Sequence, residues 1–218
     1  MFARISPRYD LLNHVLSANI DKRWRRRVVK RLQPLLKPKG KVLDVGCGTG
    51  DLSIELFERT AAQVTGVDFC GPMVRLAQKK APHLPFIEGD ALQLPFADGS
   101  FDGLTVAFAL RNLSSVHAGL TEFRRVLKPG GWLAILEFSQ PTVPMMRQLV
   151  RFYYWRLLPW IGGWLSGSRS AYEYLPDSIS KFPNQQALAG MMCAVGFDQV
   201  RFENLSGGIA ALHIGRRA

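Results

Sequence analysis

The stretch Val42-Leu-Asp-Val-Gly-Cys-Gly-Thr-Gly50 joins a short apolar run to glycines at positions 46, 48 and 50. An amphipathic run, residues 51–60, follows at once, so the pattern predicts a β-strand that turns tightly into a helix. Glycine lets the backbone turn and lets a ligand approach without a Cβ in the way. The stretch therefore predicts a loop that binds a nucleotide-like ligand at the carboxyl edge of a sheet, although such a loop can also serve only as a turn.

On either side of this loop, β-rich runs alternate with helix-like runs. The β-rich runs are residues 41–45, 63–67, 86–87, 101–108 and 132–138, and the helix-like runs are 51–60, 72–80 and 116–127. This alternation predicts an α/β fold whose parallel sheet is covered by helices on both faces. Pro129-Gly130-Gly131 is expected to separate the last of these helices from the strand that follows it.

The end of the chain shows a different pattern. Residues 185–195 are predicted to form a helix, and the runs 197–204 and 209–214 are separated by Ser206-Gly207-Gly208. This spacing predicts a terminal antiparallel hairpin.

A length of 218 residues favours one domain, in which four segments are distinguished. They are a basic N-terminal helical segment (1–40), a cofactor-binding core (41–140), a helical insertion expected to cover the substrate (141–182) and a terminal helix with its hairpin (183–218).

The net charge of +11 is distributed unevenly along the chain. Residues 1–41 hold 12 basic and 2 acidic side chains, residues 42–140 hold 8 and 11, and residues 141–218 hold 8 and 4. Basic ends around an acidic middle favour an anionic membrane surface over nucleic acid as the partner, with a solvated helix face as the alternative.

Three scattered cysteines without metal-ligand spacing predict neither a disulfide framework nor a metal site. The sequence shows no secretory signal and no apolar run of spanning length. We therefore expect a cytoplasmic protein that associates peripherally with the inner face of the membrane.

Acidic residues near the glycine loop indicate which ligand it takes. The G-x-G-x-G spacing differs from the G-x-G-x-x-G of dinucleotide sites, and Asp51 at the start of the helix suits a cationic centre better than a phosphate. Asp68 ends the next strand, where a carboxylate can accept both hydroxyls of a ribose. Asp90 follows the third strand and can accept from the exocyclic amine of adenine. An adenosine without phosphates that carries a cation describes S-adenosylmethionine, and here the sequence resembles the Rossmann-like class I methyltransferases.

Two longer patterns narrow this resemblance. They are Tyr9-Asp10-x-x-Asn13-x-x-x-Ser17, with Trp24 downstream, and Arg125-Val-Leu-Lys-Pro-Gly-Gly-x-Leu-x-x-Leu136-Glu-x-Ser139. Both are similar to the signatures of the quinone-biosynthesis C-methyltransferases, as is the run Phe108-Ala-Leu-Arg-Asn112. The resemblance extends over essentially the whole chain.

The resemblance implies a seven-stranded, mostly parallel sheet with a terminal antiparallel hairpin, S-adenosylmethionine as cofactor, S-adenosylhomocysteine as product and no metal. The cofactor-binding residues that it implies, together with the loop glycines, are Gly46, Gly48, Thr49, Gly50, Asp68, Asp90, Ala91 and Ala107. Ala107 stands where the family has a serine, so a hydroxyl contact is lost there. In the first signature, Leu12 replaces the usual methionine, and Asp21 stands where some members have histidine, so no histidine there is given a catalytic role.

Candidate catalytic and substrate-binding residues come from the same motifs. Arg111 is expected to stabilise a quinolate oxygen, directly or through a water, with a structural ion pair as the alternative. Tyr9 is a second candidate for positioning the substrate, and Asn13 and Asn112 are weaker ones. Tyr153 and Trp155 belong to an aromatic run that can either pack in the core or accept a polyprenyl tail.

The resulting prediction is a C-methyltransferase that methylates the ring of a polyprenylated quinol. Asp21 and the chain length favour demethylmenaquinol, and a 2-polyprenyl-6-methoxybenzoquinol or another sterol-like or phenol-like acceptor is the alternative. An RNA or protein methyltransferase is disfavoured because Arg111-Asn-Leu-Ser stands where an amino-group methylase would carry a Pro-Pro-aromatic motif. The glycine spacing disfavours a nucleotide-binding reductase. The sequence leaves homodimerisation open.

Overall fold

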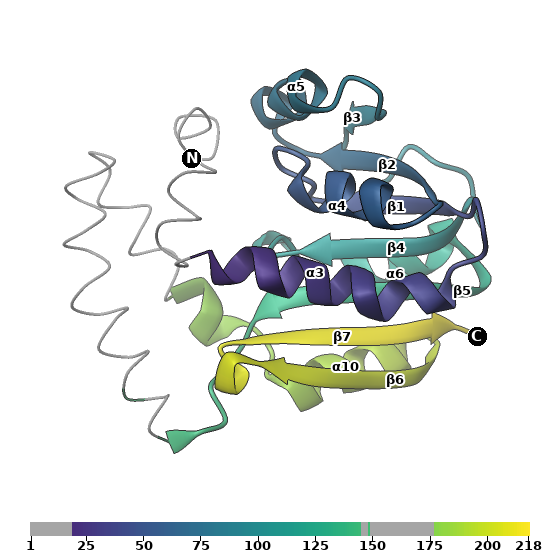
Figure 1. The fold of residues 1–218 in the computed structure, drawn as a ribbon. Coiled ribbons are helices and arrows are strands. Elements are labelled where there is room, and N and C mark those ends of the chain that lie inside the picture. Colours follow the sequence, from purple (N-terminus) through teal and green to yellow (C-terminus); the bar gives the residue numbers. More distant parts are fainter. Residues whose placement is uncertain (1–18, 145–147, 149–176) are drawn as a thin grey trace.

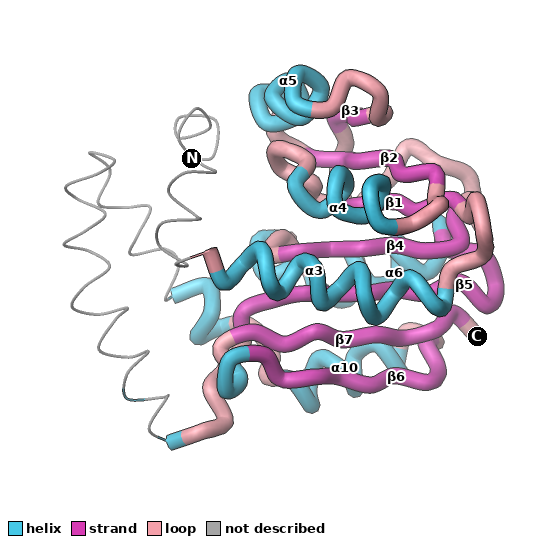
Figure 2. The backbone as a smooth tube through the Cα atoms, in the orientation of Figure 1, coloured by secondary structure: helices cyan, strands magenta, loops and turns pink. Residues whose placement is uncertain are grey.

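The computed structural model describes residues 19–144, 148 and 177–218. Within these residues, seven strands form one sheet in the order β3-β2-β1-β4-β5-β7-β6 (Figures 1 and 2). The strands are β1 (Lys41–Val45), β2 (Gln63–Asp68), β3 (Phe86–Glu88), β4 (Phe101–Ala107), β5 (Leu127–Phe138), β6 (Phe197–Leu205) and β7 (Ala210–Arg217). The α-helices whose bounds lie within these residues are α3 (Ile20–Leu32), α4 (Asp51–Arg59), α5 (Gly71–Lys80), α6 (Val116–Val126) and α10 (Gln185–Ala194).

The first five strands are parallel, as predicted from their alternation with helices. β1 pairs with β2 and β4, β2 with β3, and β4 with β5. The apolar residues of β1 are buried on both faces of the sheet, which is typical of a parallel strand covered on both sides. The carboxyl ends of β1, β2 and β4 therefore meet at one edge of the sheet.

Two helical layers enclose the sheet. On one face, α6 and α10 bury Leu120, Phe123, Leu188 and Met192 against the central strands. On the other face, α3 and α4 cover the sheet, and they lie in front of it in Figure 1. Each fully buried side chain of this size contributes roughly 1.5–3 kcal/mol, so both layers are tied to the sheet mainly by apolar burial.

The described part of the basic N-terminal segment packs on this core. α3 buries Trp24, Val28 and Leu32 against the sheet, and a short 3-10 helix, η2 (Gln33–Leu35), contains Pro34 and ends the helical region. Within the helical segment expected at 1–40, the helix that the structure describes therefore runs from Ile20 to Leu32. Most of its basic side chains are exposed, whereas Asp21 is buried and Arg25 is half-buried.

The start of β5 differs from the prediction. Pro129-Gly130-Gly131 does not separate α6 from the strand, because β5 already begins at Leu127. Leu127 pairs with Phe101 and Trp132 pairs with Gly103, so the residues between them form an irregularity within the ladder. Gly130 has a φ of 77°, a conformation that glycine adopts readily, and this allows the strand to continue past the bulge.

The antiparallel hairpin at the end of the chain is confirmed. β6 pairs with β7, and β7 in turn lies antiparallel to β5, so the hairpin enters the sheet with its second strand innermost. The connection is a short 3-10 turn, η5 (Ser206–Gly208). The described helices include none that is long and apolar enough to cross a membrane.

Candidate active site

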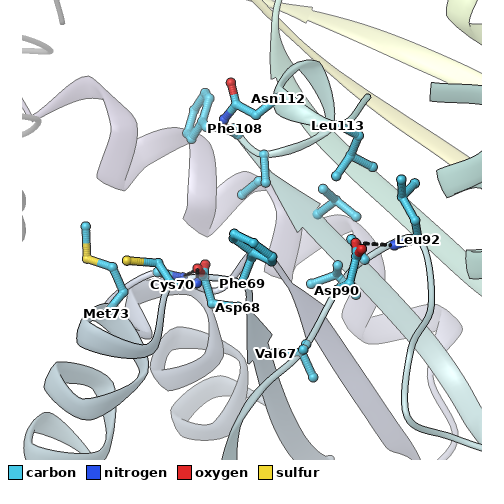
Figure 3. A pocket seen from close by; sticks show the side chains of 18 of the residues that line it. Val67, Asp68, Phe69, Cys70, Met73, Asp90, Leu92, Phe108, Asn112 and Leu113 are labelled. Atoms are coloured by element: carbon cyan, nitrogen blue, oxygen red, sulfur yellow. Dashed lines mark hydrogen bonds between the residues drawn. The ribbon is translucent and has the colours of Figure 1, made fainter. Parts of the chain in front are cut away.

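A cavity of about 400 Å³ lies at the edge of the sheet where β1, β2 and β4 end (Figure 3). This volume is in the range of small-ligand sites. Its lining includes the carboxylates of Asp68 and Asp90, and no Lys, Arg or His of the described ranges lines it. The cavity is therefore suited to a neutral or cationic ligand and not to a phosphate.

The glycine loop forms the floor of this cavity. Gly46 and Gly48 line it, with φ angles of 67° and 56° that glycine tolerates best. A Cβ at Gly46 would lie 2.3 Å from the Cβ of Ala109, whereas one at Gly48 would meet nothing within 4 Å. Gly46 thus permits close packing, and Gly48 leaves the backbone open to a ligand. Thr49 is buried, and neither it nor Gly50 belongs to the lining of the cavity.

Asp68 links the glycine loop to the end of β2. Its Oδ2 accepts a hydrogen bond from the N–H of Gly48 at 2.7 Å, and its Oδ1 accepts one from the N–H of Cys70 at 2.8 Å. Desolvation by burial raises the pKa of Asp68, and these two donors partly oppose the shift. Because each carboxylate oxygen has a second lone pair, Asp68 can still accept the two hydroxyls of a ribose.

A second buried carboxylate lies on β1, shortly before the glycine loop. Asp44 on β1 is buried, and its oxygens accept from the hydroxyls of Ser53, at 2.6 Å, and Thr105, at 2.8 Å. Desolvation raises the pKa of Asp44 to about 6. Asp44 does not line the cavity, and its two hydrogen bonds link β1 to α4 and to β4.

The predicted contacts beyond β3 and β4 reach the same cavity. Asp90 accepts from the N–H of Leu92 at 2.9 Å, which orders the turn after β3, and Ala91 and Ala107 line the wall. Ala107 has no hydroxyl, so it offers a ligand only its methyl group and its backbone.

Phe69 is a cavity residue that was not predicted from the sequence. It follows Asp68 directly, lines the cavity and is 79% exposed (Figure 3). An exposed aromatic ring beside a ribose-binding carboxylate can stack on a planar heterocycle. The signal that could have found it is an aromatic residue immediately after a strand-ending aspartate.

A different wall is formed where the chain leaves β4. Phe108, Asn112 and Leu113 line the cavity there. Arg111 does not line it: its Nη1 donates to Oε1 of Glu137 and to the carbonyl of Phe108, each at 2.6 Å. Its Nε is buried without a hydrogen-bond partner among the described residues. The ion pair is the alternative named for Arg111, and its role toward a substrate stays a prediction.

The expectation that Asp51 presents its charge to the ligand is wrong. Asp51 forms ion pairs with Arg25, at 3.0 Å, and with Lys80, and it does not line the cavity. Its carboxylate instead ties α3 and α5 to the start of α4. Among the described residues, the negative charge at the cavity therefore comes from Asp68 and Asp90.

Four predicted residues lie outside the described part of the chain. They are Tyr9, Asn13, Tyr153 and Trp155. Most of the insertion at 141–182 lies outside it as well. Across the residues that are described, no group of three or more His, Cys, Asp or Glu side chains could hold a metal ion.

This fold, with an acidic and phosphate-excluding cavity beside a glycine loop, defines a class I S-adenosylmethionine-dependent methyltransferase. Solved structures show the same fold. A possible histamine N-methyltransferase from Thermotoga maritima has a TM-score of 0.72 at 18% identity, covering 100% of this chain and 98% of that one. Phosphoethanolamine N-methyltransferase 2 of Haemonchus contortus, in complex with S-adenosyl-L-methionine, has a TM-score of 0.67 at 15% identity over 88% of this chain and 52% of that one.

Sequence comparison places the chain more narrowly. The model of the ubiE/COQ5 methyltransferase family matches residues 1–217, and the chain belongs to this family. It is 47% identical to a demethylmenaquinone methyltransferase of Thermus thermophilus, over 100% of both chains. It is also 45% identical to a ubiquinone/menaquinone biosynthesis C-methyltransferase of a Geobacter species, over 100% of this chain and 94% of that one.

Proposed function

We propose that this methyltransferase transfers the methyl group of S-adenosylmethionine to a ring carbon of a polyprenylated quinol, with demethylmenaquinol as the acceptor. The observation that carries the proposal is one cavity with two chemically different sides. The carboxylates of Asp68 and Asp90 lie on one side, and the other side is a wall formed by the apolar Phe108 and Leu113 and the amide of Asn112. Relatives named for demethylmenaquinone methylation, from Thermus thermophilus and Deinococcus radiodurans, support this acceptor.

The residues on the carboxylate side of the cavity fit the cofactor. Asp68 would hold the ribose, Asp90 the adenine amine, and Gly48 would let the backbone approach the rest of the molecule. When bound, the cofactor supplies an electrophilic methyl group on a positively charged sulfonium. The two carboxylates favour a positive charge in the cavity, because no Lys, Arg or His of the described residues lines it beside them.

The residues at the other wall would hold the acceptor. Transfer in line requires the acceptor carbon to be close to the methyl group and aligned with it, so positioning can supply much of the acceleration. Phe108 and Leu113 offer apolar contact to a ring, and Asn112 offers an amide to its hydroxyl. Tyr9, Asn13, Tyr153 and Trp155 remain candidates for positioning the ring and its tail.

Arg111 would stabilise the quinolate oxygen, directly or through a water. Arg111 lies between Phe108 and Asn112, which both line the cavity, and this place in the chain supports the role. We expect Arg111→Ala to lower kcat/KM for the quinol while S-adenosylhomocysteine still binds. A value within about threefold of wild type would rule the role out.

The choice of ring is tested by product analysis. The full chain would be given labelled S-adenosylmethionine with reduced demethylmenaquinone in one reaction and with reduced 2-polyprenyl-6-methoxybenzoquinone in another. We expect labelled menaquinol, identified by mass, to be the faster product. Label in the benzoquinol alone would assign the chain to the ubiquinone branch, and label in neither would overturn the proposal.

We also propose that the protein reaches its substrate at an anionic membrane surface, on the cytoplasmic side. Much of the basic charge of α3 is compensated internally, because Arg25, Arg27 and Arg31 pair with acidic side chains of the core. Lys22, Arg23 and Lys30 are exposed and form no ion pair with another described residue. They are the residues of α3 best able to attract anionic headgroups, each by about 1 kcal/mol near the surface.

Vesicle sedimentation tests this attraction. Binding to phosphatidylglycerol vesicles should weaken as salt rises and should fall further in Lys22→Gln/Arg23→Gln. The variant Arg75→Gln/Lys79→Gln removes the same charge from the exposed side of α5 and is the matched control. Equal binding to neutral phosphatidylcholine vesicles, or equal loss in both variants, would contradict the assignment to α3.

A further inference from the structure

The wall after β4 is held in an unusual backbone conformation. Phe108 has a φ of 59°, in the left-handed region that bulky residues rarely adopt, and it lines the cavity beside Asn112. Figure 3 shows the Phe108 ring and the Asn112 side chain next to each other. A conformation of this kind persists only where neighbouring groups impose it, and such positions concentrate at functional sites.

Three sets of contacts hold Phe108. Its N–H donates to the carbonyl of Leu136 at 2.8 Å, and its ring packs against the rings of Trp24 and Phe138, with centroids 6.0 and 4.8 Å away. Its carbonyl accepts from Nη1 of Arg111 at 2.6 Å. The first two fix the strand end and the ring, and the third fixes the direction in which the chain continues toward Asn112.

Glu137 on β5 in turn holds Arg111. Its Oε1 accepts from Nη1 of Arg111 at 2.6 Å, and its Oε2 accepts from the backbone N–H of Arg111 at 3.2 Å. One carboxylate thus engages both the side chain and the backbone of the 3-10 helix η3 (Leu110–Asn112). The side chains of Glu137 and Arg111 are only 2% and 9% exposed, so this contact is shielded from water.

Fold stability alone does not account for this pair. A buried ion pair is often no more stabilising than apolar residues of similar volume. The pair lies directly behind the cavity wall, and its members bond the backbone of the segment that carries Phe108 and Asn112. The geometry of the Glu137–Arg111 pair therefore helps to fix the position of the cavity wall.

We propose that Glu137 is a positioning residue for methyl transfer, which through Arg111 fixes the Phe108–Asn112 wall against the acceptor. This inference rests on the proposed function, since it assigns the wall to the quinol. It separates two quantities: acceptor turnover depends on Glu137, whereas cofactor affinity, which depends on Asp68, Asp90 and the glycine loop, does not.

The test is Glu137→Gln in the full chain. The amide keeps the size of the side chain, but it removes the charge that pairs with Arg111 and turns one of the two acceptors into a donor. We expect kcat/KM for reduced demethylmenaquinone to fall by about 30-fold or more, while the Kd of S-adenosylhomocysteine by calorimetry stays within about threefold of wild type. The matched control is Glu203→Gln. Glu203 lies on β6 and contacts Arg27 and Arg31 of α3, so this variant also removes a charge from an ion pair. It should leave both kcat/KM and the Kd of S-adenosylhomocysteine unchanged.

The outcomes separate the alternatives. A folded Glu137→Gln with kcat/KM within about threefold of wild type, or a parallel loss of cofactor affinity and kcat/KM, would overturn the positioning role. If the glutamine variant does not fold, Glu137→Asp keeps the charge and withdraws it by one methylene, and the same split between the two measurements is expected and decisive. A wild-type chain that binds S-adenosylhomocysteine but methylates neither quinol would overturn the proposed function itself, whereas an active wild type with an unaffected variant overturns only the role of Glu137.

Discussion

At the scale of single residues, neighbouring glycines of the cofactor loop serve different purposes. Both line the cavity and have positive φ angles, but only Gly46 packs against Ala109, whereas a Cβ at Gly48 would meet nothing within 4 Å. Gly46 is therefore required mainly for packing and Gly48 mainly for ligand access, and substitutions can distinguish the two roles.

We predict that Gly46→Ala mainly destabilises the fold and that Gly48→Ala mainly weakens the cofactor. The left-handed backbone costs either alanine about 1–2 kcal/mol, but only Gly46→Ala adds a clash with Ala109. Urea unfolding and calorimetry with S-adenosylhomocysteine measure the two effects. The assignment fails if Gly48→Ala is the less stable of the two proteins.

Asp44 gives a prediction on pH. Desolvation raises its folded-state pKa to about 6 from 3.8, so between these values the folded state binds more protons than the unfolded state. Asp44 thus contributes stability that is complete below the lower value and is lost as pH rises through about 6. Relative to Asp44→Asn, wild type should gain about 2 kcal/mol between about pH 7.5 and pH 4.5, read from urea unfolding at several pH values. A difference that does not change with pH would contradict the shifted pKa.

At the scale of elements, the N-terminal helix is joined to the cofactor-binding core by charge as well as by apolar contact. Arg25 on α3 contacts Asp21 at 2.5 Å and Asp51 at 3.0 Å, and Asp51 begins α4 directly after the glycine loop. The Arg25 side chain is 13% exposed, so this pairing is largely shielded from solvent.

We expect Arg25→Met to cost about 2–4 kcal/mol in the free energy of unfolding, because it leaves the carboxylate of Asp21 buried without this partner. Arg26→Met is the matched control on the same helix. Arg26 is 59% exposed and contacts Glu55 at 3.6 Å, so its loss should cost less than about 0.5 kcal/mol. Equal effects in urea unfolding would show that Arg25 contributes only surface charge.

The sequence predicted the elements themselves closely, because each depends on local periodicity. The strand at 41–45 and the hairpin at the end of the chain were both predicted, whereas the bulge at Pro129-Gly130-Gly131 was not. A Pro-Gly-Gly run looks the same in a loop and in a bulge, and only the partner strand distinguishes them.

At the scale of the whole molecule, the charge distribution has a structural meaning. Several arginines of residues 19–41 form ion pairs with Asp51, Glu55 and Glu203. Part of the positive charge of this region is therefore compensated within the fold. The uncompensated positive charge that α3 presents to solvent is therefore smaller than the number of its basic residues indicates.

Ligand binding should stabilise the whole fold in proportion to affinity. We predict that S-adenosylhomocysteine at about 100 times its Kd adds about 2.7 kcal/mol and raises Tm by several degrees. NAD at the same concentration should leave Tm unchanged, because the cavity lining offers its pyrophosphate two carboxylates and no cation of the described residues. A matching rise with NAD, in the same thermal scan, would argue for a dinucleotide site.

The amino-acid sequence alone was sufficient for the order of strands and helices, the glycine loop and the acidic residues at strand ends. Such features follow from local patterns, and parallel strands bring their carboxyl ends to one edge. Only the tertiary structure showed that Phe69 is exposed in the cavity. It also showed that Asp51 forms ion pairs with Arg25 and Lys80, and that Arg111 pairs with Glu137. These facts depend on which distant side chains meet when helices pack on the sheet, and no spacing along the chain encodes such a meeting.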